Sequence, residues 1–84
     1  MEYHVEFSPR ARKELDGLDP TVRERIVRAL FPLYSFSIRT GNVRKLEDPL
    51  TGYRLRVGEY RILFEIKGHA ITVFRVLHRK DAYR

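Results

Sequence analysis

Residues Tyr53–Arg61 read Tyr-Arg-Leu-Arg-Val-Gly-Glu-Tyr-Arg, a pattern that predicts two antiparallel strands joined by a tight turn. Side chains alternate between the two faces of a strand, so Arg54 and Arg56 point to one face and their apolar neighbours to the other. Gly58-Glu59 is a two-residue connection with glycine first, which is typical of a type II′ hairpin turn. This turn sets the register and is expected to place Arg56 directly opposite Arg61.

Two arginines that face each other across a sheet repel, so the pairing brings nothing to folding. Because the chain keeps both arginines despite this repulsion, we expect them to hold an anion between them. The alternative is a solvated polar face from which the two side chains splay apart.

The distribution of charge also favours an anionic partner. The 84 residues carry a net charge of +6. Residues 1–52 hold 9 basic and 8 acidic side chains, whereas residues 53–84 hold 8 basic and 3 acidic ones. A one-sided positive field favours a polyanion, with nucleic acid first and an acidic protein second.

The composition, 43% apolar and 12% aromatic, is that of a globular chain, and we expect one domain over residues 1–84. There is no cysteine, which excludes disulfides and thiolate metal sites. No apolar run approaches the roughly 18 residues that span a membrane, and the N-terminus lacks a signal-peptide pattern. We therefore expect a cytoplasmic protein without a membrane partner.

The first half of the chain predicts a strand followed by two helices. Tyr3–Phe7 alternates between apolar and polar residues, and Ser8-Pro9 is typical of an N-cap and a first helical residue. Gly17 is expected to end this helix. Asp19-Pro20 repeats the start signal, and Pro32 is expected to end or bend the second helix. Its apolar positions are Val22, Ile26, Ala29, Leu30 and Leu33.

The second half predicts a loop and then strands. Residues 36–51 show no regular period and are expected to form a long loop. Within it, Arg44 and Lys45 are candidate phosphate contacts, with solvated loop charges as the alternative. Tyr60–Ile66 predicts the next strand. Ala70–Leu77 is apolar on both faces apart from Thr72 and Arg75, which predicts a strand in the interior of the sheet.

These elements predict an α+β fold in the order strand, helix, helix, strand, strand, strand, with the last three as an antiparallel meander. The helices are expected to cover the face that holds Leu55, Val57, Ile62, Phe64 and Ile66. The arginine-bearing face is then expected to stay open.

The position of His78 depends on the last turn. If Gly68-His69 is a two-residue turn, Arg61 pairs with Val76, and His78 shares the face of the arginine pair. The tail, residues 79–84, follows at the same end of the sheet.

These side chains together fit metal-free cleavage of RNA, in which a ribose 2′-hydroxyl attacks the adjacent phosphate without a cofactor. Arginine binds phosphate through two N–H groups and stabilises a charged transition state. His78 can move a proton near neutral pH, and Tyr83 can stack on a base. A structural, hydrogen-bonded His78 and a frayed or packed Tyr83 are the alternatives.

Two motifs resemble the RelE/ParE superfamily of toxins from prokaryotic toxin–antitoxin pairs. They are Gly52–Ile62 and Val76–Tyr83, and the N-terminal Phe7-Ser8 and the two-helix pattern agree with them. The resemblance spans essentially the whole chain. It implies a helical hairpin packed on an antiparallel sheet, and a cognate RelB-like antitoxin as a partner.

The superfamily divides in function. RelE-like members are ribosome-dependent ribonucleases that cut mRNA in the decoding site, whereas ParE-like members poison DNA gyrase and are not nucleases. The tail His78–Tyr83 favours the RelE-like branch, because ParE-like tails generally lack the late tyrosine. The ribosome and mRNA are then the expected partners. The alternatives are a ParE-like gyrase inhibitor and a nuclease-inactive relative that binds only an antitoxin.

Resemblance to the RelE-like branch implies a role for each site residue. Arg54 and Arg56 would be the basic strand pair of the catalytic centre, Arg61 and Arg79 the phosphate-stabilising arginines, and Tyr83 the stacking residue. Further RNA contacts are expected from Arg44, Lys45, Lys80 and Arg84.

One departure from the family concerns the general base. Some RelE members have lysines where Arg54 and Arg56 stand, and a lysine there is thought to accept the proton. Arginine stays protonated in proteins and is a poor base. Either His78 moves the proton, or activity is weak, or the RNA of the ribosome assists.

Overall fold

The computed structural model describes residues 3–34, 43–46 and 52–82. Its elements in chain order are β1 (His4–Phe7), α1 (Pro9–Asp16), α2 (Pro20–Tyr34), β2 (Val43–Lys45), β3 (Tyr53–Val57), β4 (Tyr60–Lys67), β5 (Ala70–His78) and α3 (Arg79–Ala82). The predicted α+β class is confirmed, and β2 and α3 add to the predicted order. Among the described residues, no helix has the length and apolar character needed to cross a membrane.

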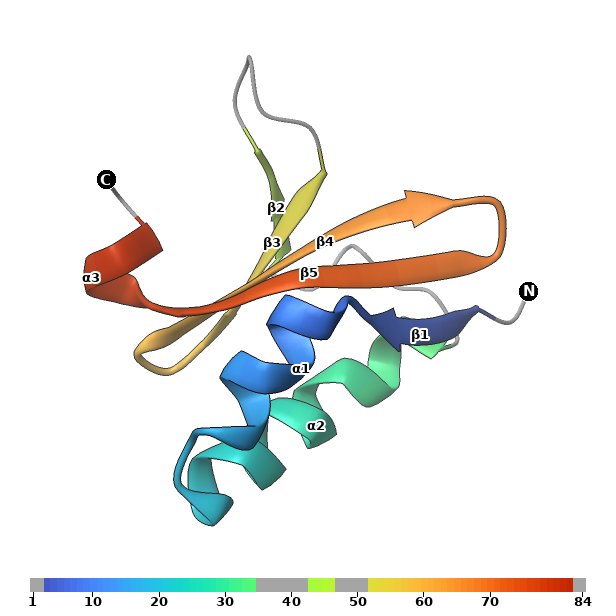
Figure 1. The fold of residues 1–84 in the computed structure, drawn as a ribbon. Coiled ribbons are helices and arrows are strands. Elements are labelled where there is room, and N and C mark those ends of the chain that lie inside the picture. Colours follow the sequence, from blue (N-terminus) through green and yellow to red (C-terminus); the bar gives the residue numbers. More distant parts are fainter. Residues whose placement is uncertain (1–2, 35–42, 47–51, 83–84) are drawn as a thin grey trace.

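The strands form one sheet in the order β1-β5-β4-β3-β2 (Figure 1). The predicted meander of β3, β4 and β5 is confirmed, and β5 lies inside the sheet as expected. The first strand pairs in parallel with the last, His4 opposite Ala70. The prediction of an unbroken loop over residues 36–51 is wrong at Val43–Lys45, which pairs with β3 as the opposite edge strand.

Both helices begin where the sequence predicted. Ser8 caps α1 by accepting a hydrogen bond from the Ala11 N–H at 3.1 Å, and Asp19 Oδ1 accepts one from the Thr21 N–H at 2.9 Å. Gly17 follows α1 in a right-handed conformation, with φ of −80°. The second helix runs to Tyr34, so Pro32 does not end it at its own position.

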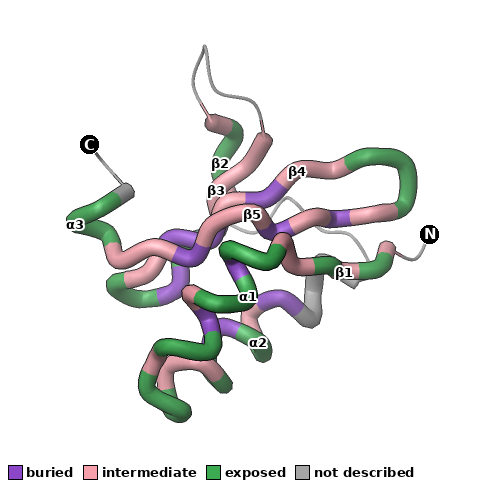
Figure 2. The backbone as a smooth tube through the Cα atoms, viewed as in Figure 1, coloured by how far each residue is buried: buried purple, intermediate pink, exposed green. Residues whose placement is uncertain are grey.

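The core lies between the helices and one face of the sheet (Figures 1 and 2). Ile26 and Leu30 of α2 and Ala11 and Leu15 of α1 are buried against the strands. The buried strand residues are Leu55, Val57, Ile62, Phe64, Ile71, Val73 and Val76. Burying a side chain of this size stabilises the fold by roughly 1.5–3 kcal/mol. The predicted choice of the helix-covered face is therefore confirmed.

Both hairpin turns have two residues, as predicted. Val57 pairs with Tyr60 around Gly58-Glu59, and Lys67 pairs with Ala70 around the second turn. Gly58 has φ of +58°, a left-handed conformation that a residue with a Cβ adopts only at a cost. Glycine at this position therefore fixes where β3 ends and β4 begins.

Candidate functional site

Four arginines lie on the sheet face that points away from the helices. Arg56 is directly opposite Arg61 across β3 and β4, as predicted, and Arg44 of β2 is directly opposite Arg54 of β3. Alternation along β3 puts both pairs on the same side. We call this set, Arg44, Arg54, Arg56 and Arg61, the arginine face. Opposite side chains in such pairs have Cβ atoms about 4.5–5.5 Å apart, so the four positive charges are concentrated there.

Arg61 differs from the other members because it is buried. The residue is only 7% exposed, and its Nη1 donates hydrogen bonds to the carbonyl oxygens of Gly58 and Tyr60, each at 3.0 Å. The expectation of an open arginine face is therefore wrong for Arg61 and holds for the exposed Arg56. The reason is that the Arg61 guanidinium bends back onto its own hairpin turn, which fixes its position.

The helical turn α3 docks against the β3–β4 turn. The Arg79 N–H donates to the Glu59 carbonyl oxygen at 2.6 Å, and Arg79 Nε lies 3.3 Å from Glu59 Oε2. The helical turn α3, which carries Arg79 and Lys80, therefore lies at the end of the sheet formed by the β3–β4 turn (Figure 1). The expectation that the tail lies at this end of the sheet is confirmed up to Ala82. Tyr83 and Arg84 are outside the described residues.

The predicted position of His78 is wrong. A β-bulge in β5 opposes both Phe74 and Arg75 to Leu63, so the register moves by one residue beyond Val73. Arg61 consequently pairs with Leu77 instead of Val76. His78 pairs with Tyr60, which alternation places on the other side of the sheet from Arg61.

His78 instead holds α3 in place. Its Nδ1 accepts a hydrogen bond from the Lys80 N–H at 3.2 Å, the contact that an N-cap side chain makes with the second helical residue. Its ring meets Tyr60 edge-on, with centroids 5.4 Å apart and planes at 81°. A backbone N–H can only donate, so Nδ1 is unprotonated in this arrangement.

Sequence reasoning missed a second arginine arrangement, between Glu14 of α1 and Arg75 in the bulge. Arg75 donates three hydrogen bonds to the Glu14 carboxylate at 2.9–3.2 Å, and the Val76 N–H donates a fourth at 2.9 Å. Burial raises the pKa of Glu14, but these hydrogen bonds and the charges of Arg75 and Arg10 outweigh it, so the pKa lies below its ordinary value.

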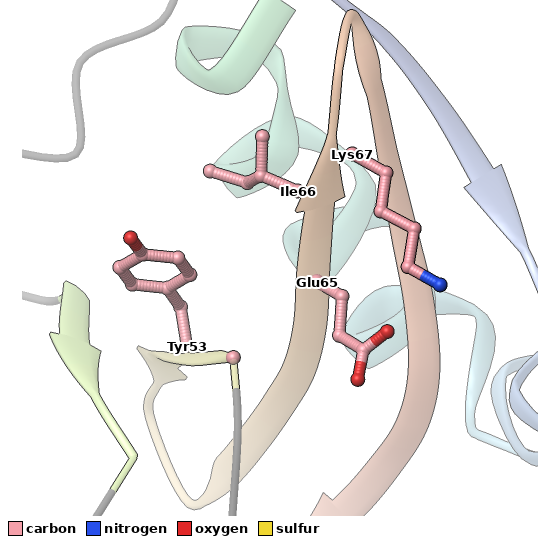
Figure 3. A pocket seen from close by; sticks show the side chains of 5 residues that line it. Tyr53, Glu65, Ile66 and Lys67 are labelled. Carbon is pink, nitrogen blue, oxygen red and sulfur yellow. The ribbon is translucent and has the colours of Figure 1, made fainter.

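A pocket of about 350 Å³ lies at the other end of β3 and β4 from the turn (Figure 3). Tyr53 stacks on Phe64 beside it, with centroids 5.6 Å apart, and Glu65 and Lys67 extend to the opposite side of the strand from Ile66. No predicted site residue lines this pocket. In the described part of the chain, no three His, Asp or Glu side chains are grouped as metal ligands.

Comparison with known proteins places this geometry in a family. The model of a family described as the ParE toxin of type II toxin–antitoxin systems matches residues 5–83. The toxin RelG of Mycobacterium tuberculosis is 36% identical over 88 residues, which span all of this chain and 99% of that protein. The chain belongs to the RelE/ParE family of toxins.

Other relatives of this RelE/ParE toxin agree. The toxin RelE3 of Methanocaldococcus jannaschii is 45% identical over 42 residues, half of this chain and 48% of that protein. The toxin–antitoxin complex RelBE2 of M. tuberculosis contains a chain with a TM-score of 0.78 and 29% identity, covering 94% of this chain and all of that one. The RelB–RelE complex of Methanococcus jannaschii gives a TM-score of 0.76 and 32% identity, over 93% and 94% of the two chains.

Proposed function

We propose that this toxin is a ribosome-dependent endoribonuclease that cuts mRNA and so inhibits translation. The observation that carries the proposal is the register that sets Arg56 opposite Arg61, next to the docked Arg79 and Lys80. Like charges gathered around a fixed turn fit a phosphodiester. The names of two relatives, RelE3 and RelG, support the same branch of the family.

In the proposed reaction the ribose 2′-oxygen attacks the adjacent phosphorus. The new O2′–P bond forms as the P–O5′ bond breaks, leaving a 2′,3′-cyclic phosphate and a 5′-hydroxyl. Arg61, held by two turn carbonyls, stabilises the charge that develops on the phosphoryl oxygens, and Arg56 and Arg79 bind from the exposed side. Arg54 belongs to the same catalytic centre, and Tyr83 stacks on the base beside the cut.

The proton relay of this reaction does not require His78. Its Nδ1 is occupied by the Lys80 N–H, and its strand position faces away from Arg61. We assign His78 to positioning the tail that carries Arg79 and Tyr83. Removing the proton from the 2′-hydroxyl and supplying one to the departing 5′-oxygen then fall to the ribosome's RNA or to the tail.

The proposed binding partners are the decoding site of the ribosome with its mRNA, and a RelB-like antitoxin. Two structural neighbours are toxins bound to antitoxins, at 29% and 32% identity. Arg44, Lys45, Lys80 and Arg84 are proposed as additional RNA contacts, since Arg44, Lys45 and Lys80 are exposed. A basic surface of this kind favours an acidic antitoxin segment as its cover.

The decisive experiment is cell-free translation with the purified toxin, followed by mapping of mRNA 5′ ends. Cuts within translated codons that depend on ribosomes are the expected result. Intact mRNA at toxin concentrations that stop growth in vivo would refute the nuclease.

A second candidate function is inhibition of DNA gyrase without nuclease activity. The family model that matches this chain is described as that of the ParE toxin, and this description favours the gyrase inhibitor. A supercoiling assay with purified gyrase separates the two functions, because the proposed nuclease leaves supercoiling unchanged.

A further inference from the structure

Arg25 of α2 reaches the β3–β4 turn from the helix side of the sheet. A Cβ built on Gly58 would lie 2.9 Å from Arg25 Nη1 and 3.2 Å from its Cζ and Nη2. The guanidinium group therefore lies directly against the turn backbone, in space that only glycine leaves open. Arg25 is exposed, so the outer side of its guanidinium faces solvent.

Arg25 has no acidic residue three or four positions away on its own helix, the spacing at which helical side chains pair. Arg28 pairs with Glu24 at 2.6 Å and Arg12 pairs with Asp16 at 3.2 Å, each four residues away. The residues four positions before and after Arg25 are Thr21 and Ala29, which carry no charge. Within the described part of the chain, the Arg25 side chain makes no hydrogen bond or ion pair.

Arginine side chains from three elements other than β3 therefore lie against the β3–β4 turn. Arg25 comes from α2, Arg61 from β4 and Arg79 from α3, and all three guanidinium groups contact Gly58 or Glu59. The turn supplies one carboxylate, Glu59, which is paired with Arg79. Positive charge therefore continues around the turn from the arginine face to the helical hairpin.

We propose that Arg25 binds a phosphate of the RNA next to the one held on the arginine face, so that the strand crosses the β3–β4 turn. An arginine fixed against backbone loses little side-chain freedom when it binds, and its planar fork matches phosphate oxygens. The ligand rests on the proposed function, because it is the same single-stranded RNA. The proposed contact lies on α2, an element that carries none of the proposed catalytic residues.

The test measures binding of a fluorescent single-stranded RNA of about ten nucleotides, 2′-O-methylated so that it cannot be cut, between roughly 50 and 200 mM salt. Arg25→Gln should weaken binding roughly tenfold at low salt and reduce the slope of log K against log salt by about 0.7, the value for one phosphate contact on a single strand. Arg25→Lys should keep the slope. The matched control is Arg28→Gln, which removes the same charge from the same helix.

Equal slopes for Arg25→Gln and Arg28→Gln would overturn the proposal, as would failure of the wild-type toxin to bind the RNA at low salt. Unchanged RNA binding combined with weaker antitoxin binding would assign Arg25 to the antitoxin and also overturn it. The assay contains no ribosome, so its result is independent of mRNA cleavage. A toxin that binds RNA through Arg25 but cuts no mRNA would refute the nuclease and leave this site standing.

Discussion

Arg75 and the arginine face lie in the same sheet but in opposite electrostatic settings. Arg75 meets the Glu14 carboxylate through three hydrogen bonds at 2.9–3.2 Å, which join α1 to the bulge of β5. On the arginine face, Arg56 is opposite Arg61, so each strand position meets a like charge.

Arginine therefore has two different roles in this sheet. The Glu14–Arg75 pair replaces strand pairing where β1 has ended, since Glu14 also accepts from the Val76 N–H. The arginine face brings like charges together on one side of the sheet, which opposes folding and is suited to binding an anion. Substitutions in the Glu14–Arg75 pair should therefore change the free energy of unfolding, and substitutions on the arginine face should change RNA cleavage.

Arg61→Ala should produce the largest loss of cleavage and also a loss of stability. Arg61 belongs to the arginine face but, like Arg75, is held by hydrogen bonds within the protein. We expect mRNA cleavage to fall about 10²–10³-fold, as for loss of a transition-state donor. We also expect unfolding to become easier by about 1–3 kcal/mol, because two turn carbonyls lose a buried partner. Single-turnover cleavage on programmed ribosomes and urea unfolding measure the two effects.

The control for Arg61 is Arg56→Ala, whose side chain is exposed. It should impair cleavage while changing the free energy of unfolding by no more than about 0.5 kcal/mol. Wild-type cleavage by Arg61→Ala would remove this residue from the active site.

Glu14→Gln should change stability and leave the site intact. The Arg75 and Glu14 side chains are 27% and 22% exposed, so solvent weakens the pair relative to a fully buried one. We expect a loss of about 1–3 kcal/mol in the free energy of unfolding, with cleavage per folded molecule unchanged. A decrease in cleavage larger than the decrease in the fraction of folded protein would contradict the assignment of Glu14 to stability alone.

The same pair predicts a pH dependence. The pKa of Glu14 in the folded protein lies below its ordinary value of 4.5, so its stabilising contribution is complete above that pH and is lost as the pH falls through the lower, folded value. Stability should therefore fall more steeply on acidification in the wild type than in Glu14→Gln. Parallel curves for the two proteins, measured by urea unfolding, would exclude this linkage.

His78→Ala should have a smaller effect, through the docking of α3. Loss of an N-cap costs about 0.5–2 kcal/mol locally, and cleavage should fall only as far as the tail becomes less ordered. His78→Asn restores an acceptor near the position of Nδ1 and should recover activity, with an unchanged pH profile. Loss of activity in both variants with an altered profile would make His78 the general base after all.

Arg28→Ala should have the smallest effect. Its ion pair with Glu24 is exposed, at 72% and 64% of the two side chains, and exposed pairs four residues apart contribute about 0.3–0.5 kcal/mol. Thermal unfolding and mRNA cleavage should both stay close to wild type. A large loss of cleavage would extend the functional surface beyond the turn.

Local rules predicted the hairpins correctly because two-residue turns set the register from their own sequence. Gly58-Glu59 placed Arg56 opposite Arg61, and Gly68-His69 paired Lys67 with Ala70. These pairings depend on nothing outside the hairpin. The Arg56–Arg61 pair of the candidate site was therefore readable from the sequence.

The bulge was not predictable in the same way because contacts with distant residues accompany it. The Ser8 N–H donates to the Val73 carbonyl oxygen, and Glu14 bonds both Arg75 and the Val76 N–H. These contacts join residues about sixty positions apart, which no local pattern reports. The position of His78 was wrong for this reason.

The short strand β2 and the position of Arg25 were missed for a related reason. Three residues, Val43–Lys45, are too few to show alternation, and they form a strand because β3 pairs with them. In the sequence, nothing distinguishes Arg25 from the other arginines of the second helix, Arg23 and Arg28. Only the packing of the helix on the sheet brings it to Gly58.

The parallel pairing of β1 with β5 has a consequence for synthesis of the toxin. His4 is synthesised well before its partner Ala70, because translation adds only about 5–20 residues per second. Until then Ile71 and Val73 are missing from the core, and α1 has no bulge to bind. We expect an unfinished chain to carry the arginines of β3 without a fold to hold them. The folded arginine face is therefore expected only after β5 has been synthesised and has paired with β1.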